Sequence, residues 1–256
     1  MKDLFKSLPE VKKKLLPADG CVLMLDFDGT LSPLAETPDQ ALLPKDAKEI
    51  LKKMSRRIPT AIVSGRSLAD IRRRVGISGI LYVGNHGLEW QIGATRDTVK
   101  IPAAMVRALT ATGARLNDLK ERYPGVIVED KGMTWSLHYR LVPQHRVKRI
   151  LFELRAITKQ FRKWHLLKIV EGKKVFEVRP DMHWNKGHWA TFFYHTFGRR
   201  SIPIYIGDDF TDEDAFKMLK KGITVNVGKS KGSKAAYFCR TTKQVAEFLN
   251  WLGAVA

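Results

Sequence analysis

Cysteine, long apolar runs and acidic residues are all scarce in this chain of 256 residues. Two cysteines, Cys21 and Cys239, cannot form a framework of disulfides, so we expect a reducing, cytoplasmic compartment. No stretch approaches the ~20 apolar residues that a membrane-spanning helix requires. The first residues alternate charged and apolar side chains, which is unlike the apolar centre of a secretion signal. We therefore predict no membrane partner.

The shortage of acidic residues leaves 45 Lys and Arg against 26 Asp and Glu, a formal net charge of +19. Such a charge could serve a nucleic acid or an anionic membrane. The basic residues are scattered along the chain, however, and no basic run is interleaved with aromatic residues. We therefore favour a solvated basic surface on a protein that handles small anions over a nucleic-acid partner. The sequence leaves the oligomeric state open.

Strand and helix patterns alternate in residues 1–100 and again in residues 181–256. The expected strands are short, unbroken apolar runs at 21–27, 59–65, 79–85, 201–209 and 222–228. The expected helices have apolar residues at helical spacing over 44–57, 67–75, 185–197, 211–221 and 243–252. Apolar strands joined by helices predict an α/β fold with a parallel sheet that is covered on both faces.

Residues 101–180 follow a different pattern. Two long helical segments, 103–122 and 142–163, are each followed by a hairpin, at 125–140 and 164–179. The order αββαββ with short turns is typical of an antiparallel α+β domain. We therefore predict a small domain inserted into the parallel one.

Acidic residues gather where two of the expected strands end. Asp26 and Asp28 lie at the end of the expected strand 21–27, and Asp208 and Asp209 lie at the end of 201–209. A helix start with Thr211 as N-cap, completed by an acid three residues later, would explain the acids after residue 211 but not Asp208 and Asp209. Ligands bind at the carboxyl ends of parallel strands, and carboxylates gathered there suggest Mg²⁺.

Groups that can bind an anion accompany these acids. Ser64 and Gly65 end the second strand, and Lys186 opens a helix, whose N-terminus favours anions. Singly, each would be an ordinary turn or surface residue. Together with the acids they fit a phosphate site with a carboxylate nucleophile.

The pattern of Asp26-x-Asp28-x-Thr30, Ser64, Lys186 and Asp208-Asp209 resembles the haloacid dehalogenase (HAD) superfamily of phosphatases. Within that superfamily, four blocks are similar to the trehalose-6-phosphate phosphatase family: DFDGTLSP (26–33), IVSGR (62–66), GNHGLE (84–89) and GDDFTDEDAF (207–216). The resemblance implies a HAD-like Rossmannoid catalytic core formed by residues 1–100 and 181–256, with residues 101–180 as an inserted cap that recognises the substrate.

The resemblance also implies roles for the core residues. Asp26 would attack phosphorus to form an aspartyl-phosphate, and Asp28 would protonate the leaving sugar oxygen and then activate water. The carboxylates of Asp26 and Asp208 and the main-chain carbonyl of Asp28 would hold Mg²⁺. Ser64 and Lys186 would bind the phosphoryl oxygens. The remaining core positions implied are Asp209 and Asp212, as metal ligands or anchors, and Thr30, Gly65, Arg66, Asn85 and His86, as substrate-binding residues.

In the cap, the family's sugar-binding positions match Glu129, Lys131, Glu177 and Arg179, whereas His138 is expected on a sheet face. The implied reaction is hydrolysis of trehalose 6-phosphate to trehalose and phosphate, which ends trehalose biosynthesis. Two alternatives remain open at this stage. One is a related phosphatase acting on sucrose, mannosylglycerate or glucosylglycerol phosphates, and the other is a basic nucleic-acid-binding protein on the same scaffold.

Overall fold

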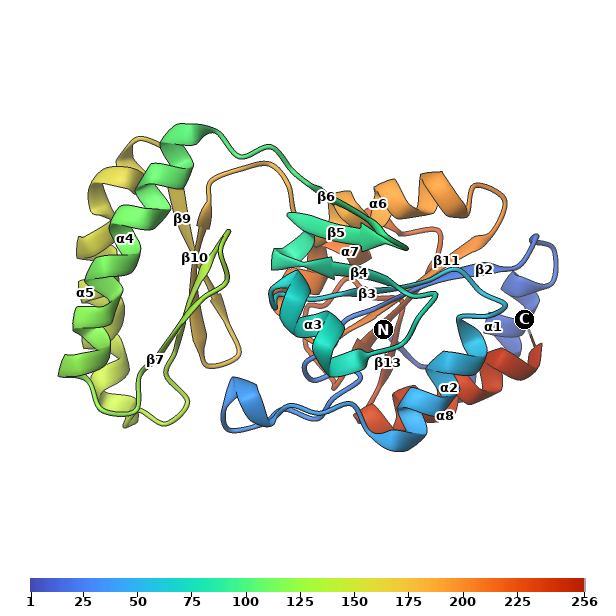
Figure 1. Ribbon diagram of the computed structural model, residues 1–256. Helices are drawn as coiled ribbons and strands as arrows, with labels where there is room; N and C mark the ends of the chain where they lie inside the picture. The colour runs from blue at the N-terminus through green and yellow to red at the C-terminus, as the bar shows by residue number, and fades with distance from the viewer. Residues whose placement is uncertain (256) are drawn as a thin grey trace. The chain divides into compact units, whose positions relative to one another are not determined.

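The computed structural model describes residues 1–255, which divide into two compact units (Figure 1). The first unit comprises Met1–Thr98 and the described chain from Trp184 onward. The second unit comprises Val99–His183, where the sequence predicts an inserted domain at 101–180. Among residues 1–255, no helix combines the length and the hydropathy that crossing a bilayer demands.

The first unit is built on one sheet with the strand order β1-β13-β12-β11-β2-β3-β4-β5-β6. All neighbours pair in parallel except β5 and β6, which extend the β4 edge as an antiparallel hairpin. The strands are β1 (Lys2–Asp3), β2 (Cys21–Leu25), β3 (Thr60–Val63), β4 (Leu81–Gly84), β5 (Glu89–Ile92), β6 (Thr95–Thr98), β11 (Ile202–Gly207), β12 (Ile223–Val227) and β13 (Tyr237–Cys239). The predicted parallel sheet is confirmed.

Helices cover both faces of this sheet (Figure 1). Alternate residues of β2 show the division, because Leu23 and Leu25 pack in one apolar cluster and Val22 and Met24 in the other. The first cluster is covered by α1 (Leu8–Leu15), α2 (Lys45–Met54), α3 (Leu68–Val75) and α8 (Thr242–Val255), and the second by α6 (Lys186–Phe197) and α7 (Glu213–Met218). Strands buried on both faces explain why the sequence shows unbroken apolar runs.

Local capping signals set several helix ends. The Ser67 side chain accepts a hydrogen bond from the main-chain N–H of Asp70, and Gly76 ends α3 at a φ of 58°. The helix expected at 211–221 is shorter, because a 3₁₀ turn at Phe210–Asp212 precedes α7. Its capping box joins Asp209 and Asp212, so the cap expected at Thr211 was wrong.

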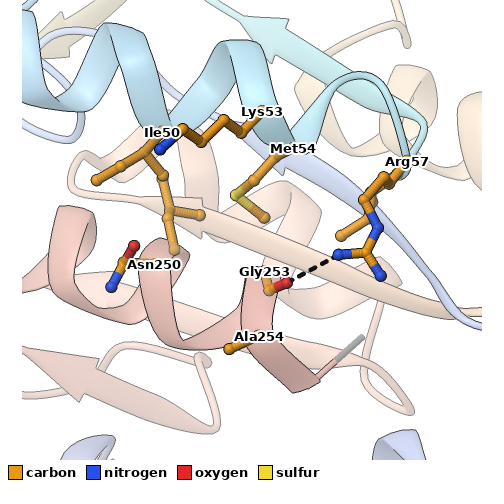
Figure 2. Close-up of a pocket in the computed structure, with 9 residues that line it drawn as sticks. Ile50, Lys53, Met54, Arg57, Asn250, Gly253 and Ala254 are labelled. Atoms are coloured by element: carbon orange, nitrogen blue, oxygen red, sulfur yellow. Dashed lines mark hydrogen bonds between the residues drawn. The ribbon is translucent and has the colours of Figure 1, made fainter.

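Helices α2 and α8 leave a cavity of about 290 Å³ between their C-terminal ends (Figure 2). Met54 and Gly253 contribute to its lining. Arg57 closes one side by donating a hydrogen bond from Nη1 to the carbonyl oxygen of Gly253 at 3.2 Å. Cationic side chains at helix C-termini are favourable because the last carbonyl groups there lack intrahelical partners.

The second unit has one antiparallel sheet, with the order β7-β8-β10-β9, and two helices. Its elements are α4 (Ala103–Arg122), β7 (Ile127–Asp130), β8 (Trp135–His138), α5 (Gln144–Lys163), β9 (Leu167–Gly172) and β10 (Val175–Pro180). Leu137, Phe176 and Val178 pack against the helices, and the alternating residues Ser136 and Glu177 lie on the opposite face. The predicted order αββαββ is confirmed.

Candidate active site

The ends of four strands and the start of one helix assemble the predicted residues of the first unit. Asp26 follows β2, Ser64 follows β3, Asn85 follows β4 and Asp208 follows β11, while Lys186 is the first residue of α6. Since β11, β2, β3 and β4 are consecutive and parallel in the sheet, their carboxyl ends share one edge. The polar residues that follow them are therefore neighbours in space.

Lys186 is the buried cation of this site. Its ammonium donates to Oδ1 of Asp26 at 2.6 Å and to Oδ1 of Asp212 at 2.7 Å, and its side chain is only 3% exposed. Burial opposes the charge on Lys186, but the carboxylates of Asp212 and Asp26 outweigh it and raise the pKa of the lysine well above its usual value. The ammonium therefore stays charged at neutral pH.

Asp212 is fully buried and accepts hydrogen bonds on both oxygens. Its Oδ1 accepts from Lys186 and from the Tyr205 hydroxyl at 2.8 Å, and its Oδ2 accepts from the main-chain N–H groups of Asp208 and Asp209, both at 3.0 Å. An ionised carboxylate offers about four lone-pair sites, so these four donors fill its capacity. Asp212 is thus suited to anchoring Lys186 and the loop after β11 rather than to binding a further cation.

The carboxylates at this edge can accommodate a metal ion. One oxygen each from Asp26, Asp208 and Asp212 lies within 4.8 Å of the others. Asp208 lies against Gly29, where an added Cβ would fall 2.1 Å from its Oδ2, so only glycine leaves room for that carboxylate. Because donors already occupy both oxygens of Asp212, the carboxylates of Asp26 and Asp208 are the ones whose hard oxygen ligands suit Mg²⁺.

The pKa of Asp26 supports the same conclusion. Burial raises it well above its usual value; Lys186 opposes this rise, whereas the carboxylates of Asp212 and Asp208 add to it. A divalent cation beside Asp26 and Asp208 would offset that accumulation of negative charge and favour the ionised form of Asp26.

Asp28 is held by a fork of two hydrogen bonds. Arg66 donates from Nε to Oδ2 at 2.8 Å and from Nη2 to Oδ1 at 2.7 Å. The Asp28 side chain is 35% exposed, whereas that of Arg66 is 7% exposed. A bidentate guanidinium fixes both the position and the plane of a carboxylate. The sequence assigned Arg66 to the substrate, and in the structure it contacts Asp28.

The loop after β4 is tied to the loop after β3. The main-chain N–H groups of Asn85 and His86 donate to the carbonyl oxygens of Arg66 at 2.7 Å and Ser64 at 2.9 Å. Asn85 and His86 adopt positive φ values of 46° and 60°, a conformation that costs non-glycine residues about 1–3 kcal/mol and is concentrated at functional sites. The His86 ring lies over Gly65, where an added Cβ would be 2.3 Å from Cε1.

Two hydroxyl groups complete the polar cluster of the first unit. Ser64 is fully buried, and its Oγ accepts a hydrogen bond from the main-chain N–H of Arg66 at 3.1 Å. Thr30 is also fully buried, and its Oγ1 has no hydrogen-bond partner within residues 1–255. A buried hydroxyl without a protein partner is costly unless a ligand or water satisfies it. Thr30 therefore fits the substrate-binding position that the sequence predicts for it.

The predicted sugar-binding residues of the second unit form a cluster of their own. Glu177 accepts from Lys131 at 3.1 Å and from the Ser136 hydroxyl at 3.2 Å, and Arg179 also pairs with it. Glu129 contacts His138 across the β7–β8 pair at 3.0 Å. The structure thus places Glu129 on β7, Lys131 just after β7, and Glu177 and Arg179 on β10 of the same sheet, and it adds Ser136 and His138, on the intervening β8, to them.

Three polar residues that contact members of the site were not among the site residues predicted from the sequence. Tyr205 lies in an apolar strand, where nothing distinguishes it from a core residue. Glu89 accepts from Asn85 Nδ2 at 2.6 Å and from the Leu68 main-chain N–H at 2.8 Å, so it joins the two loops. Asp70 on α3 pairs with Arg66, which precedes the helix, and the spacing of four residues between them is the signal that could have suggested this contact.

Comparison with known proteins identifies relatives along most of the chain. The sequence pattern of the family described as "Trehalose-phosphatase" matches residues 24–244. A trehalose-phosphate phosphatase of Mycobacterium tuberculosis is 35% identical over 260 aligned residues, which cover 96% of this chain. Trehalose-phosphate phosphatase B of Arabidopsis thaliana is 34% identical over 90% of the chain. The chain spans 66% of the length of each of these two relatives.

Solved structures agree on the fold. The C-terminal domain of a trehalose-6-phosphate phosphatase from C. albicans has a TM-score of 0.85 at 20% identity, with 97% of both chains covered. A trehalose-6-phosphate phosphatase from Aspergillus fumigatus has a TM-score of 0.66 at 25% identity, again with 97% of both chains covered. Together with the sequence match over residues 24–244, these comparisons show that the chain belongs to the trehalose-phosphatase family.

Proposed function

We propose that this chain hydrolyses trehalose 6-phosphate to trehalose and inorganic phosphate, the reaction that ends trehalose biosynthesis. The main observation in support of this proposal is the buried Asp26–Lys186 ion pair beside Asp208, at the edge of the sheet where the strands have their carboxyl ends. Membership of the trehalose-phosphatase family supports the choice of substrate. A carboxylate that is paired with a buried ammonium and next to a cation site suits nucleophilic attack on a phosphomonoester.

In the proposed reaction a carboxylate oxygen of Asp26 attacks phosphorus while the bond from phosphorus to the sugar oxygen breaks. Asp28 gives its proton to the departing sugar oxygen, which leaves an aspartyl-phosphate and a neutral sugar. Asp28, now ionised, then takes a proton from water, which attacks phosphorus and releases phosphate and Asp26. Ser64 and Lys186 bind the phosphoryl oxygens, and Lys186 keeps its charge through both steps.

A Mg²⁺ ion would be held by the carboxylates of Asp26 and Asp208 and by the main-chain carbonyl of Asp28. When bound, it supplies positive charge that screens the phosphate from the attacking carboxylate. Asp212, whose oxygens are occupied, and Asp209, which caps the following turn, hold the loop that presents Asp208.

Replacing the nucleophile tests the reaction. Asp26→Asn keeps the shape of the side chain but removes the attacking charge, so we expect phosphate release from trehalose 6-phosphate to fall by at least about 10³-fold. The measurement is phosphate release by the full chain with Mg²⁺ and with EDTA. Asp97→Asn, at an exposed position on β6, is the matched control and should match wild type. Undiminished turnover by Asp26→Asn, or wild-type turnover unaffected by EDTA, would contradict this mechanism.

The polar cluster of the second unit is proposed to bind the sugar. Carboxylates and ammonium groups that are already fixed by one another can exchange hydrogen bonds with sugar hydroxyls at little entropic cost. Both acceptors and donors are supplied from one sheet, by Glu129 on β7, Lys131 just after it, and Glu177 and Arg179 on β10.

The sugar-binding proposal predicts a substrate-selective defect. Glu129→Ala should raise KM for trehalose 6-phosphate by roughly tenfold, the loss of about one charged hydrogen bond, while KM for p-nitrophenyl phosphate stays within twofold. Steady-state kinetics on both substrates give the comparison, with Glu121→Ala on the exposed side of α4 as control. An equal rise for both substrates would remove Glu129 from sugar recognition.

A panel of glycoside phosphates addresses the choice of substrate. We expect kcat/KM for trehalose 6-phosphate to exceed that for sucrose, mannosylglycerate and glucosylglycerol phosphates, and equal values would defeat the trehalose assignment.

The cytoplasmic compartment and the absence of a nucleic-acid or membrane partner stay predictions. Both cysteines are free and buried, as a reducing compartment would permit.

A further inference from the structure

We propose that Asp70 is a positioning residue, which holds Arg66 so that its guanidinium can orient the Asp28 carboxylate. The inference rests on the proposed function, because it concerns the proton that Asp28 transfers. Asp70 lies on α3, and among the hydrogen bonds found in residues 1–255 its link to Asp28 runs through Arg66.

Arg66 connects the two carboxylates through different edges of its guanidinium. Its Nε and Nη2 donate to Asp28, and its Nη1 donates to Asp70 Oδ2 at 2.8 Å. Nη2 also donates to the carbonyl oxygen of Pro38 at 3.0 Å. The side chain of Asp70 is 15% exposed, so solvent screens this pair little. The chain of contacts from Asp70 to Asp28 thus consists of charged hydrogen bonds of ordinary length in a largely buried setting.

Asp70 is itself fixed by its helix. The Ser67 cap places the main chain at residue 70, and Arg74, one turn later on α3, donates from Nε to Asp70 Oδ2 at 2.7 Å. Arg74 also donates hydrogen bonds from Nη1 to the carbonyl oxygens of Asp39 at 3.1 Å and Ala41 at 2.8 Å. Arg66 and Arg74, both held by Asp70, therefore secure the segment 38–41 beside Arg66. Arg73 also pairs with Asp70, but it is 73% exposed and touches neither that segment nor Asp28 among the contacts found in residues 1–255.

Loss of Asp70 should therefore affect proton transfer in particular. Without its second carboxylate, the long Arg66 side chain can leave the geometry in which both Asp28 oxygens are engaged. A misplacement of about 1 Å in a catalytic group can cost 10²-fold in rate. A sugar alcohol needs its oxygen protonated as it leaves, whereas p-nitrophenolate leaves readily without a proton. The two leaving groups thus separate a defect at Asp28 from a general loss of structure.

The experiment compares kcat/KM for trehalose 6-phosphate and for p-nitrophenyl phosphate, since this ratio covers every step up to loss of the leaving group. Asp70→Asn should lower it at least tenfold for the sugar phosphate and less than threefold for p-nitrophenyl phosphate. Arg73→Gln, which removes only the exposed partner, should change neither substrate by more than twofold. Asp70→Glu, which restores the charge, should recover part of the loss. Thermal denaturation of each variant shows that it is folded.

A double-mutant cycle with Arg66 provides a second readout. If Asp70 acts through Arg66, adding Asp70→Asn to Arg66→Lys should lower kcat/KM by less than twofold further. Should Asp70→Asn fail to fold, Arg66→Lys alone must show the same selectivity between leaving groups. Equal losses on both substrates, or full additivity in the cycle, would overturn the role of Asp70 while leaving the phosphatase intact. Wild-type protein inactive on both phosphomonoesters would instead overturn the proposed function.

Discussion

Tyr205 lies in the middle of an apolar strand, yet its hydroxyl group donates to Asp212, the carboxylate that anchors Lys186. Burying a carboxylate is costly unless donors replace the water it loses. Asp212 is fully buried, and Lys186, Tyr205 and two main-chain N–H groups meet this requirement. The position of Lys186 thus depends on Tyr205. Among the hydrogen bonds found within residues 1–255, Asp212 is the one member of the predicted site that the Tyr205 side chain contacts.

Removing the Tyr205 hydroxyl should lower the unfolding free energy by more than the loss of an ordinary surface hydroxyl group. Tyr205→Phe keeps the ring and its edge contact with Phe216 but leaves one acceptor site of Asp212 empty, so we expect unfolding free energy to fall by about 1.5–3 kcal/mol. Tyr237→Phe is the matched control, because its hydroxyl donates to Glu10, whose side chain is 44% exposed and can turn to water. Urea unfolding gives both values. Similar costs for the two variants would contradict the role given to Tyr205.

At the scale of elements, the sequence was informative where local pattern decides the structure. The run from Cys21 to Leu25 followed by acids, and the Ser67 cap with Gly76 at the other end of α3, are local signals. The hairpin β5–β6 was missed because Thr95–Thr98 is exposed on every residue, so no alternation of apolar and polar side chains marks it. Contacts such as Tyr205 with Asp212, or Asp70 with Arg66, depend on how elements pack, and composition alone does not encode them.

Replacement by alanine should have opposite effects on stability at two helical glycines, Gly113 and Gly253. In α4, a Cβ on Gly113 would lie 2.1 Å from Cζ2 of Trp135, whose indole N–H is fixed to the carbonyl oxygen of Leu109 at 3.1 Å. In α8, a Cβ on Gly253 would meet its nearest neighbour, Cγ of Met54, at 3.9 Å, at the edge of the cavity between α2 and α8 (Figure 2). The first site needs glycine for space, and the second does not.

We therefore expect Gly253→Ala to stabilise the protein by about 0.5–1 kcal/mol, because alanine loses less backbone entropy than glycine when a helix forms. Gly113→Ala should destabilise it by about 1–3 kcal/mol through overpacking. Chemical denaturation of both variants beside wild type makes the comparison. A destabilised Gly253→Ala would mean that the C-terminal turn of α8 cannot accept a side chain, contrary to the space the structure shows.

At the scale of the whole molecule, charge is unevenly distributed. The net charge is +19, but three carboxylates meet at one edge of the first unit's sheet. Helix α5 alone carries seven Lys and Arg against one Glu, and most of these cations are exposed. On the proposed function, the positive molecule would attract a phosphate ester at long range, while the buried carboxylates would accept it only when Lys186 and a metal ion balance them. This arrangement reconciles an acidic site with a strongly basic protein.

The alkaline limit of stability also belongs to the whole fold, because it is set by groups that folding buries. Burial raises the pKa of Cys21 to about 11 and that of Cys239 to about 12, against 9.0 for an accessible thiol. Above about pH 9 the unfolded chain therefore releases thiol protons that the folded chain still holds. Their contribution to stability is complete below that pH and is lost as the pH rises toward 11 and 12.

Each thiol should lower the unfolding free energy by about 1.4 kcal/mol per pH unit within this window. Urea unfolding at pH 8, 9, 10 and 10.5 measures the slope. The double variant Cys21→Ala, Cys239→Ala should be less stable than wild type at pH 8, because it leaves small voids, yet lose stability more slowly between pH 9 and 10.5. Tyrosine titration is common to both proteins and cancels in the comparison. Parallel slopes would show that the two thiols ionise equally in the folded and unfolded chains, so that burial does not set the alkaline limit.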